Sequence, residues 1–377
     1  MKRSRNKAEL HILYVLENYY PNIGGVENLF KKLVEKVAEE GHRVTLITTR
    51  LSKADPAREI QGNVQIFRYR FFNRYFFTLL ALFPVLRHAG SCDLIHTTSY
   101  NAAFPAFFGA LLRRKKIIIT FHEVWASQWF KLPFMSDVGK WLHYLFEQML
   151  LRLSFDCFVG VSRSTAEDLV TAGIDPGNVR TIYNGIDYQD FIEKRTDGSV
   201  PVAKPFTYTY FGRLGVSKGL DILLESAKIY RKQNPNSRLK MIIPKTPPSF
   251  FALILSYIEK AGLREYVELH HHLSFGQLKQ ELLDSDCVVV PSLSEGFCFA
   301  AVESIALGVP VISSDQGALR EVVSGKFIKM KSPDAVSLVE ALDEARADNW
   351  EQTPVKKFEL ANTVAAYLAL YQEMTAD

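Results

Sequence analysis

Residues 287-CVVVPSLSEGFCFAAVESIALGVPVISS-314 contain one complete strand–helix–strand unit. A β-branched run at 287–290 leads through a polar loop into a segment of helical composition, and a second β-branched run follows at 309–314. This order is typical of a parallel sheet covered by helices, because parallel strands need a crossover connection. Two glutamates, Glu295 and Glu303, lie on either side of an apolar run. Since an unpartnered carboxylate is costly in apolar surroundings, the stretch predicts a polar ligand as well as a fold.

The same alternation of strands and helices extends along the whole chain. Apolar strands are expected at 10–17, 43–49, 94–99, 116–122, 157–162 and 179–184, and then at 206–212, 239–244, 267–272, 287–292 and 309–314. Between the two series, the charge, Gly and Pro of 191–206 are typical of a linker. A chain of 377 residues is longer than one core usually supports. We therefore predict an α/β protein with two doubly wound parallel-sheet domains, at 1–195 and 205–355.

The composition excludes several classes of protein. An apolar fraction of 47% and a charged fraction of 23% are those of an ordinary globular chain, and a net charge of +4 does not indicate a nucleic-acid partner. No apolar run reaches the ~18 residues of a membrane-spanning helix, and the basic N-terminus lacks the apolar core of a signal peptide. The four cysteines, Cys92, Cys157, Cys287 and Cys298, are scattered mostly through apolar runs, as is usual for buried thiols. We expect a cytoplasmic protein.

Two cations follow the first strand of the second series. In 210-YFGRLGVSKG-219, Arg213 and Lys218 come between the strand and a helix that is expected to begin near Gly219. Positive side chains beside a helix N-terminus form a site for a dianion such as a pyrophosphate. An ordinary solvated loop with two surface cations fits this segment equally well.

The glutamates of the opening stretch extend this picture. If the helix begins near Gly296, Glu295 lies at its N-terminal mouth and Glu303 two turns inside. The backbone amides of Gly296, Phe297 and Cys298 then face the mouth, where negative charge is favoured. A nucleotide sugar matches this layout, because it has hydroxyls at both ends and a diphosphate between them. Glu303 would accept a ribose diol; alternatively, it pairs with a Lys or Arg in the core.

These motifs resemble those of a known family. The segments 212-GRLGVSKG-219 and 295-EGFCFAAVE-303 are similar to two signature motifs of the retaining glycosyltransferases of family 4 (group 1), the second being the E-x7-E pattern. Further matches, 24-GGVEN-28, 184-NGID-187 and 308-GVPVISSDQGALREVV-323, occur in family order over both halves. The resemblance implies the GT-B fold, in which two Rossmann-like domains face a central cleft. It also implies that a C-terminal helix at 356–377 packs back on the first domain.

The resemblance also implies roles for individual residues. Arg213 and Lys218 would hold the donor diphosphate, Glu303 the ribose and Glu295 the donor sugar. The remaining expected contacts are backbone groups and small residues near the donor: Gly296, Phe297 and Cys298, and the loop of Gly24 and Gly25. His122 matches the position where the family places a histidine near the reacting sugar, although a hydrogen-bonded histidine at a strand end is equally consistent with the sequence.

The implied activity is the transfer of a hexose or N-acetylhexosamine from a nucleotide-diphosphate sugar to a hydroxyl of a glycan or lipid-linked acceptor, with retention of configuration, in cell-envelope glycan or glycolipid synthesis. We expect no cofactor and no metal, since no DxD-type pair lies in a loop suited to hold one. Two alternatives stay open, a nucleotide-sugar epimerase and a non-catalytic nucleotide-sugar-binding protein. Both UDP and GDP sugars also remain open, because 241-MIIPKTPPSF-250 lacks the glycine that the family usually has near the nucleobase.

Basic and aromatic residues are interleaved in 66-IFRYRFFNRYFFTLLALFPVLRH-88. Such a mixture suits a segment that lies on an anionic bilayer. We therefore consider peripheral attachment to the inner face of the cell membrane through 66–90. A core helix flanked by exposed arginines, Arg68, Arg70, Arg74 and Arg87, is an equal alternative.

Overall fold

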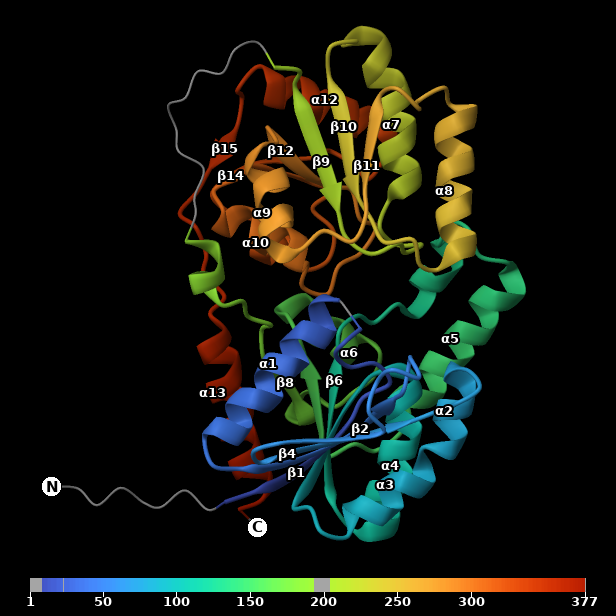
Figure 1. The fold of residues 1–377 in the computed structure, drawn as a ribbon, viewed down its shortest axis with the longest axis vertical. Helices are drawn as coiled ribbons and strands as arrows, with labels where there is room; N and C mark the ends of the chain where they lie inside the picture. Colours follow the sequence, from blue (N-terminus) through green and yellow to red (C-terminus); the bar gives the residue numbers. More distant parts are fainter. Residues whose placement is uncertain (1–8, 23, 193–203, 377) are drawn as a thin grey trace, which may run out of the picture. The chain divides into compact units, whose positions relative to one another are not determined.

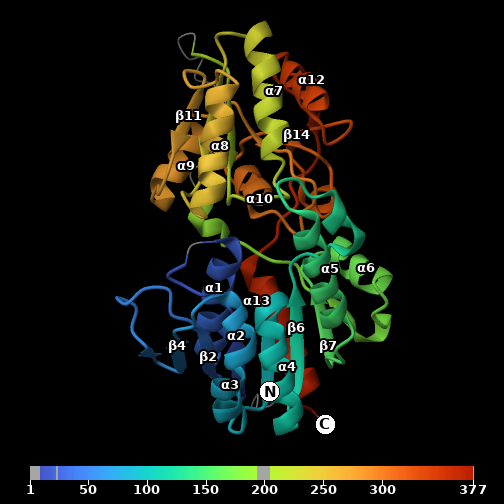
Figure 2. The same ribbon diagram turned by 90° about the vertical axis from the view of Figure 1, so that its right-hand side faces the viewer.

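The computed structural model describes residues 9–22, 24–192 and 204–376. The chain forms two compact units, shown in Figure 1 and, from the side, in Figure 2. Unit 1 comprises residues 1–130, 137–185 and 360–377, and unit 2 comprises residues 131–136 and 186–359. The change from unit 1 to unit 2 at residue 186 precedes the predicted linker, most of which, 193–203, lies outside the described residues.

Unit 1 is built on an eight-stranded sheet with the order β3-β4-β2-β1-β5-β6-β7-β8. Its strands are β1 His11–Val15, β2 Arg43–Thr49, β3 Arg58–Gln61, β4 Val64–Tyr69, β5 Leu94–Thr98, β6 Lys116–Phe121, β7 Cys157–Gly160 and β8 Val179–Thr181. All neighbours pair in parallel except β3, which is antiparallel to β4. The chain winds outward in both directions from β1 and β5, so the topological switch point lies at their carboxyl ends.

Helices cover both faces of this sheet. One face carries α2 Arg74–Leu80, α3 Leu82–Ala89, α4 Ala103–Arg113 and α5 Asp137–Leu151, and the other carries α1 Gly25–Glu39 and α13 Leu360–Met374 (Figures 1 and 2). On the first face a core of aliphatic and aromatic side chains joins the sheet to the helices, with Phe77, Val85 and Leu150 fully buried. A further helix, α6 Arg163–Thr171, follows β7.

The C-terminal helix α13 is held to unit 1 by buried hydroxyl and imidazole groups. The Tyr371 hydroxyl lies 2.8 Å from the Tyr14 hydroxyl and 2.7 Å from His96 Nδ1. His96 Nε2 and the Tyr367 hydroxyl both contact Thr120 Oγ1, at 2.8 and 3.0 Å. These contacts reach β1, β5 and β6, so α13 belongs to the packed body of unit 1. The helix begins at Leu360, four residues later than predicted, because the chain before it is extended.

Unit 2 contains a seven-stranded sheet with the order β11-β10-β9-β12-β13-β14-β15. Its strands are β9 Thr207–Phe211, β10 Arg238–Ile242, β11 Val267–His270, β12 Cys287–Val290, β13 Val311–Ser313, β14 Lys326–Lys329 and the antiparallel β15 Glu351–Gln352. The helices are α7 Leu220–Gln233, α8 Pro248–Lys260, α9 Phe275–Leu283, α10 Phe299–Ala306, α11 Leu319–Val322 and α12 Ala335–Arg346. The switch point lies between the parallel neighbours β9 and β12.

The predicted fold class is confirmed, with two parallel-dominated sheets and helices between their strands. Each strand expected from the sequence is present, although most are shorter than predicted. The strands β3, β4, β14 and β15 were not predicted. The strand β4 occupies the start of 66–90, and Arg68 on it is buried and paired with Glu59 at 2.7 Å, so this arginine is not a surface cation. Among the described residues no helix is both long and apolar enough to cross a membrane.

Candidate functional site

The carboxyl ends of β9 and β12 bring two predicted loops together in unit 2. The loop after β9 carries Arg213 and Lys218, and the loop after β12 carries Glu295. The Leu293 amide donates to the Ser217 carbonyl at 2.8 Å, which joins the two loops through their backbones. The site is therefore built where ligands of doubly wound sheets usually bind.

Lys218 and Glu295 form an ion pair. Lys218 Nζ lies 2.9 Å from Glu295 Oε1, and the two side chains are only 18% and 9% exposed. The Ser292 hydroxyl donates to the same oxygen at 2.7 Å. The structure thus brings together two residues that were predicted to contact one ligand. Ser292 was missed as a site residue, and only its position three residues before Glu295 could have indicated the contact.

Two glycines let the surrounding loops come this close. Gly219, the N-cap of α7, has φ +64°, and a side chain there would clash with the Pro291 carbonyl. Gly317 has φ +57°, and a Cβ there would clash with the backbone of Glu295. Both need the left-handed backbone that glycine adopts without strain. Gly317 lies within a motif quoted above, but its contact with Glu295 was missed because the two loops meet only in the folded sheet.

The start of α10 corrects one prediction. The helix begins at Phe299 rather than near Gly296, and its N-cap, Cys298, has a left-handed backbone with φ +71°. Glu295 and Glu303 therefore do not share one helix, and the predicted spacing of two turns between them is wrong. On either side of this turn, the buried Phe297 packs against Phe299, with ring centroids 5.1 Å apart.

The two glutamates are nevertheless close to the same thiol. Burial raises the pKa of the Cys298 thiol well above its usual range, and the charges of Glu295 and Glu303 raise it further. The thiol is therefore protonated near neutral pH. Glu303 itself is half-buried on α10 rather than enclosed in the core as expected.

Arg213 stands apart from this pair. Its side chain is exposed, while its carbonyl accepts a hydrogen bond from the Tyr210 hydroxyl at 3.1 Å. Burial raises the pKa of Tyr210 far above its ordinary value, so this hydroxyl stays protonated and donates. The contact holds the backbone of the loop, while the guanidinium is exposed.

The remaining predicted residues lie in unit 1. Gly24 is the N-cap of α1 and Gly25 its first residue. A side chain at Gly24 would clash with the carboxylate of Glu27, which is buried and accepts from Asn22 Nδ2 at 3.1 Å. His122 directly follows β6, and its ring packs edge-on against Phe30 of α1, with centroids 6.1 Å apart. The turn of Gly24 and Gly25 and the ring of His122 thus both adjoin α1.

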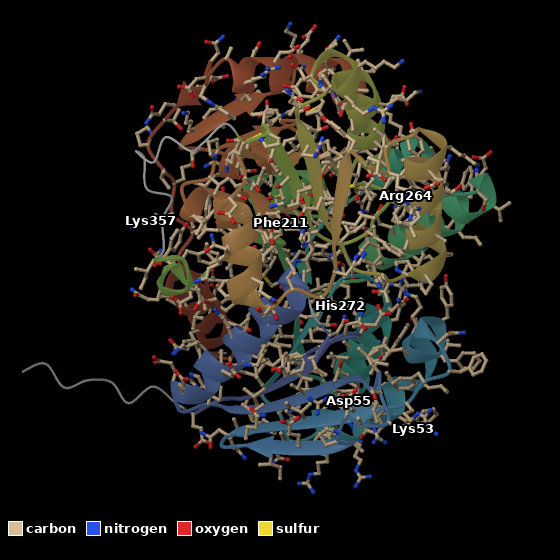
Figure 3. The ribbon with its side chains drawn as sticks, turned by 45° about the horizontal axis from the view of Figure 1, so that its top comes forward. Lys53, Asp55, Phe211, Arg264, His272 and Lys357 are labelled. Atoms are coloured by element: carbon tan, nitrogen blue, oxygen red, sulfur yellow. The ribbon has the colours of Figure 1, made fainter. Side chains whose placement is uncertain are left out.

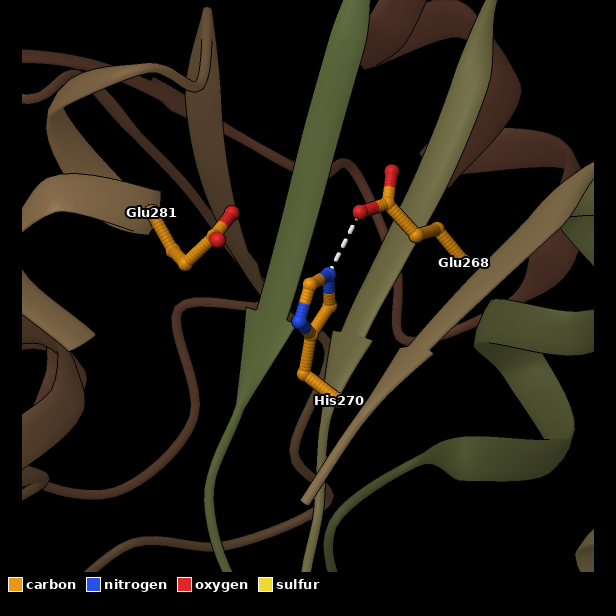
Figure 4. A group of neighbouring side chains, drawn as sticks. All are labelled: Glu268, His270 and Glu281. Carbon is orange, nitrogen blue, oxygen red and sulfur yellow. Dashed lines mark hydrogen bonds and ion pairs between the residues drawn. The ribbon is translucent and has the colours of Figure 1, made fainter. Parts of the chain in front are cut away.

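One cluster in unit 2 offers groups that could hold a metal ion. Figure 4 shows Glu268 and His270 of β11 beside Glu281 of α9, with one ligand atom of each within 4.8 Å of the others. His270 Nε2 already lies 2.5 Å from Glu268, and Glu281 lies 2.5 Å from the ammonium of Lys240. A divalent cation would have to compete with that buried ammonium, so the cluster is a poor cation site.

The strand β11 ends at His270, so the alternation of side chains along the strand does not extend to His272. His272 lies beyond the end of the strand with φ +55° (Figure 3). A cavity of about 450 Å³ lies at the opposite, amino edge of the same sheet and is lined by Phe206, Asp286, Lys326 and Trp350 among others. None of the predicted site residues contributes to its lining.

Solved structures show which class this fold defines. Sucrose-phosphate synthase from Thermosynechococcus elongatus superposes with a TM-score of 0.81 at 20% identity, covering 98% of this chain and 100% of the other. The Anabaena protein HepE in complex with UDP-glucose gives a TM-score of 0.69 at 17% identity, covering 98% of each chain. The fold is that of the GT-B glycosyltransferases.

The family follows from the sequence comparisons. Residues 23–190 match the model for Glycosyltransferase Family 4, and residues 192–358 match the model for glycosyl transferases group 1. The chain is 24% identical over 347 residues to a phosphatidylinositol N-acetylglucosaminyltransferase component of Arabidopsis thaliana, covering 89% of this chain and 74% of that protein. It is 25% identical over 320 residues to the GDP-mannose:cellobiosyl-diphosphopolyprenol alpha-mannosyltransferase of Xanthomonas oryzae, covering 81% and 79%. The chain belongs to the family 4, group 1 glycosyltransferases and is a glycosyltransferase.

Proposed function

We propose that this enzyme transfers a hexose or N-acetylhexosamine from a nucleotide-diphosphate sugar to a hydroxyl of a glycan or lipid-linked acceptor, with retention of configuration and without a metal. The observation that carries the proposal is the pair formed by Lys218 and Glu295 at the carboxyl edge of unit 2. It places a cation and a carboxylate beside the glycine-capped start of α7, where an anion is favoured.

The pair supports a simple account of bond cleavage. Breaking the bond between the sugar and the diphosphate develops negative charge on the leaving phosphate, and a fixed cation stabilises that charge. Lys218 exchanges its contact with Glu295 for the phosphate, and the exposed Arg213 reaches the same group. Glu295 is then released to accept hydroxyl groups of the donor sugar. The acceptor hydroxyl attacks from the side of the leaving group, which retains the configuration.

A double displacement would need a nucleophile on the protein. The Cys298 thiol is protonated, because burial raises its pKa, and thiolates rather than thiols are nucleophilic. Glu295, once released by Lys218, is assigned to the hydroxyl groups of the donor sugar rather than to its anomeric carbon. This supports direct transfer with Lys218 and Arg213 as the main source of electrostatic stabilisation.

The donor is bound through Glu303 and the turn before it. Glu303 lies on the first turns of α10, half-buried and close enough to Cys298 to act on its thiol. A half-buried carboxylate can accept hydrogen bonds from both hydroxyls of a ribose, and its desolvation costs less free energy than that of a fully buried one. Relatives are named for N-acetylglucosaminyl and GDP-mannose transfer, and HepE binds UDP-glucose, which supports the sugar classes proposed.

The acceptor is proposed to be lipid-linked, as the names of the two relatives indicate for those proteins. Contact with the cytoplasmic face of an anionic membrane is supported by the segment around α2 and α3, because Phe72 just before α2, Leu79 on α2 and Phe83 on α3 are 90%, 69% and 70% exposed. Further exposed apolar side chains lie on α4 and α5: Leu111, Leu112, Val138, Trp141, Leu142 and Leu145. Large exposed apolar areas of this kind mark interaction sites. Their basic neighbours, including Arg70 and Arg87, suit anionic lipid.

The test is incubation of the purified enzyme with labelled UDP and GDP sugars, with and without a membrane extract. Label that moves to the extract only in the presence of enzyme supports the proposal. Conversion of the free donor to another sugar without an acceptor identifies an epimerase instead. Binding of a donor with neither transfer nor conversion identifies a non-catalytic binding protein. The anomeric configuration of the product decides between retention and inversion.

A further inference from the structure

Glu147 of α5 is a fully buried carboxylate whose partners are all uncharged donors. Its Oε1 accepts from the Trp125 amide at 2.9 Å and from the Tyr100 hydroxyl at 3.2 Å. Its Oε2 accepts from the Ala126 amide at 2.7 Å and from the Trp129 indole N–H at 3.1 Å. One carboxylate therefore ties α5 to the connection that follows β6 and to the 3-10 turn Tyr100–Ala102 that follows β5.

The backbone that Glu147 holds is strained at two places. Tyr100 has φ +73° and Ala126 has φ +45°, in the left-handed region that residues other than glycine rarely adopt. Such conformations cost energy and persist only where the surroundings hold them. Glu147 accepts from the backbone amide of Ala126 and from the side-chain hydroxyl of Tyr100, so it helps to hold both turns.

A carboxylate is the only side chain of this size that can satisfy four donors at once. Its two oxygens carry four acceptor positions, whereas an amide would present an NH₂ group to two of the donors. The arrangement has a cost, because a carboxylate without a cation is expensive to bury. Burial raises the pKa of Glu147, against the opposing effect of the four hydrogen bonds. A site that only needed packing would be served by an apolar residue at lower cost.

The segment fixed in this way begins at His122. We propose that Glu147 is a positioning residue, which holds 122–129 in one conformation so that His122 is presented to the reacting sugar. This inference rests on the proposed function, in which His122 lies near that sugar. The donor residues Lys218 and Glu295 are in the loops after β9 and β12, and Glu303 is on α10, so loss of Glu147 changes the turnover rate and leaves donor affinity unchanged.

The experiment compares Glu147→Gln with Glu167→Gln, an exposed glutamate of α6 in the same unit. Glu147→Gln is expected to lower kcat by ~10- to 100-fold, the effect of a misplacement of about 1 Å, with KM for the donor within about twofold of wild type. Hydrogen exchange at the amides of Trp125 and Ala126 is expected to accelerate. Glu167→Gln is expected to change none of these quantities.

A milder variant covers the case in which Glu147→Gln does not fold. Tyr100→Phe removes one donor and leaves the carboxylate in place, and we expect a several-fold lower kcat with unchanged donor KM. Wild-type kcat in either folded variant, or a loss that appears only in donor KM, overturns the inference. Hydrogen exchange is measured without sugar transfer, so it tests the positioning role of Glu147 separately from the proposed transferase activity. An inactive wild-type enzyme contradicts the proposed function, whereas wild-type exchange in Glu147→Gln contradicts the positioning role.

Discussion

The ammonium of Lys218 lies 2.9 Å from the carboxylate of Glu295, a residue 77 positions further along the chain. The pair is mostly shielded from solvent, and each partner was expected to contact the donor. We propose that in the donor complex the phosphate replaces the carboxylate as the partner of Lys218, so that the pair orients the cation before the donor binds.

Lys218→Ala is expected to lower kcat by ~100-fold or more, because the leaving phosphate loses its fixed cation. The change also removes the ammonium partner of the Glu295 carboxylate and keeps its hydrogen bond from Ser292. Steady-state kinetics measure the effect, with Lys228→Ala as the control, since Lys228 forms a more exposed pair with Glu225 on α7. Equal rates in the wild type and Lys218→Ala would remove this residue from the site.

Glu303→Gln is expected to raise the dissociation constant of the donor about tenfold, the effect of weakening charge-assisted hydrogen bonds to a diol. Calorimetric titration with UDP and GDP sugars measures it and also identifies the base. The exposed Glu265 provides the matched change, Glu265→Gln, which should leave affinity unaltered. If nucleoside diphosphates bind both variants like the wild type, Glu303 does not hold the ribose.

Comparison of Gly317→Ala with Gly308→Ala separates two contributions to the loss of stability, backbone strain and steric overlap. Both glycines have positive φ, +57° and +76°, but only a Cβ at Gly317 meets neighbouring atoms, those of the Glu295 backbone. We expect Gly308→Ala to lower the free energy of unfolding by ~1 kcal/mol and Gly317→Ala by ~2–3 kcal/mol. Urea denaturation measures both, and donor binding should weaken only in Gly317→Ala. Equal losses in the two variants would show that the loop relaxes around the added methyl group.

The stability of the enzyme should fall in mild acid because of His96. Burial, with a smaller effect of His122, lowers the pKa of His96 from 6.5 to about 3. The unfolded chain therefore takes up a proton below pH 6.5 that the folded chain refuses, so stability is lost as pH falls. From about pH 7.5 to about pH 5 this group alone lowers the free energy of unfolding by ~2 kcal/mol. His96→Gln should flatten that part of the pH profile in denaturant titrations, and a slope as steep as that of wild type would contradict the assignment.

Reversal of two charges tests the proposed membrane contact. Arg70→Glu combined with Arg87→Glu should abolish co-sedimentation with anionic vesicles, because each cation near the surface contributes ~1 kcal/mol. Arg74 is left unchanged because it pairs with Glu17. The control reverses Arg264 and Lys331, two exposed cations of unit 2. Absence of vesicle binding by the wild type, or equal binding by the double variant and the control, argues against the contact.

Much of the fold could be predicted, because its signals are local. Strands such as β2 and β12 are short β-branched runs between polar turns, and α1 has its apolar residues on one face. The prediction failed where local composition was ambiguous. In β4, Arg68 stands between Phe67 and Tyr69, so the strand was taken for part of an interfacial segment, and the buried pair of Arg68 with Glu59 was not predicted.

The candidate site, like the fold, was predicted in part. The motifs predicted which residues belong to it, and the roles of Arg213, Glu303 and His122 stay predictions. The predicted start of the helix that carries Glu303 was wrong because Cys298 has a left-handed backbone, a conformation that its residue type does not indicate.

The sequence alone therefore determined the alternation of strands and helices, the order of the motifs and the family, since each depends on residues within a few positions of one another. Only the tertiary structure decided that Lys218 pairs with Glu295, that Gly317 lies against the Glu295 backbone, and that Glu147 holds the turn after His122. These contacts join loops from different strands. The geometry of these contacts depends on the order of the strands in the sheet and on backbone φ angles. It cannot be predicted from the spacing of residues in the sequence.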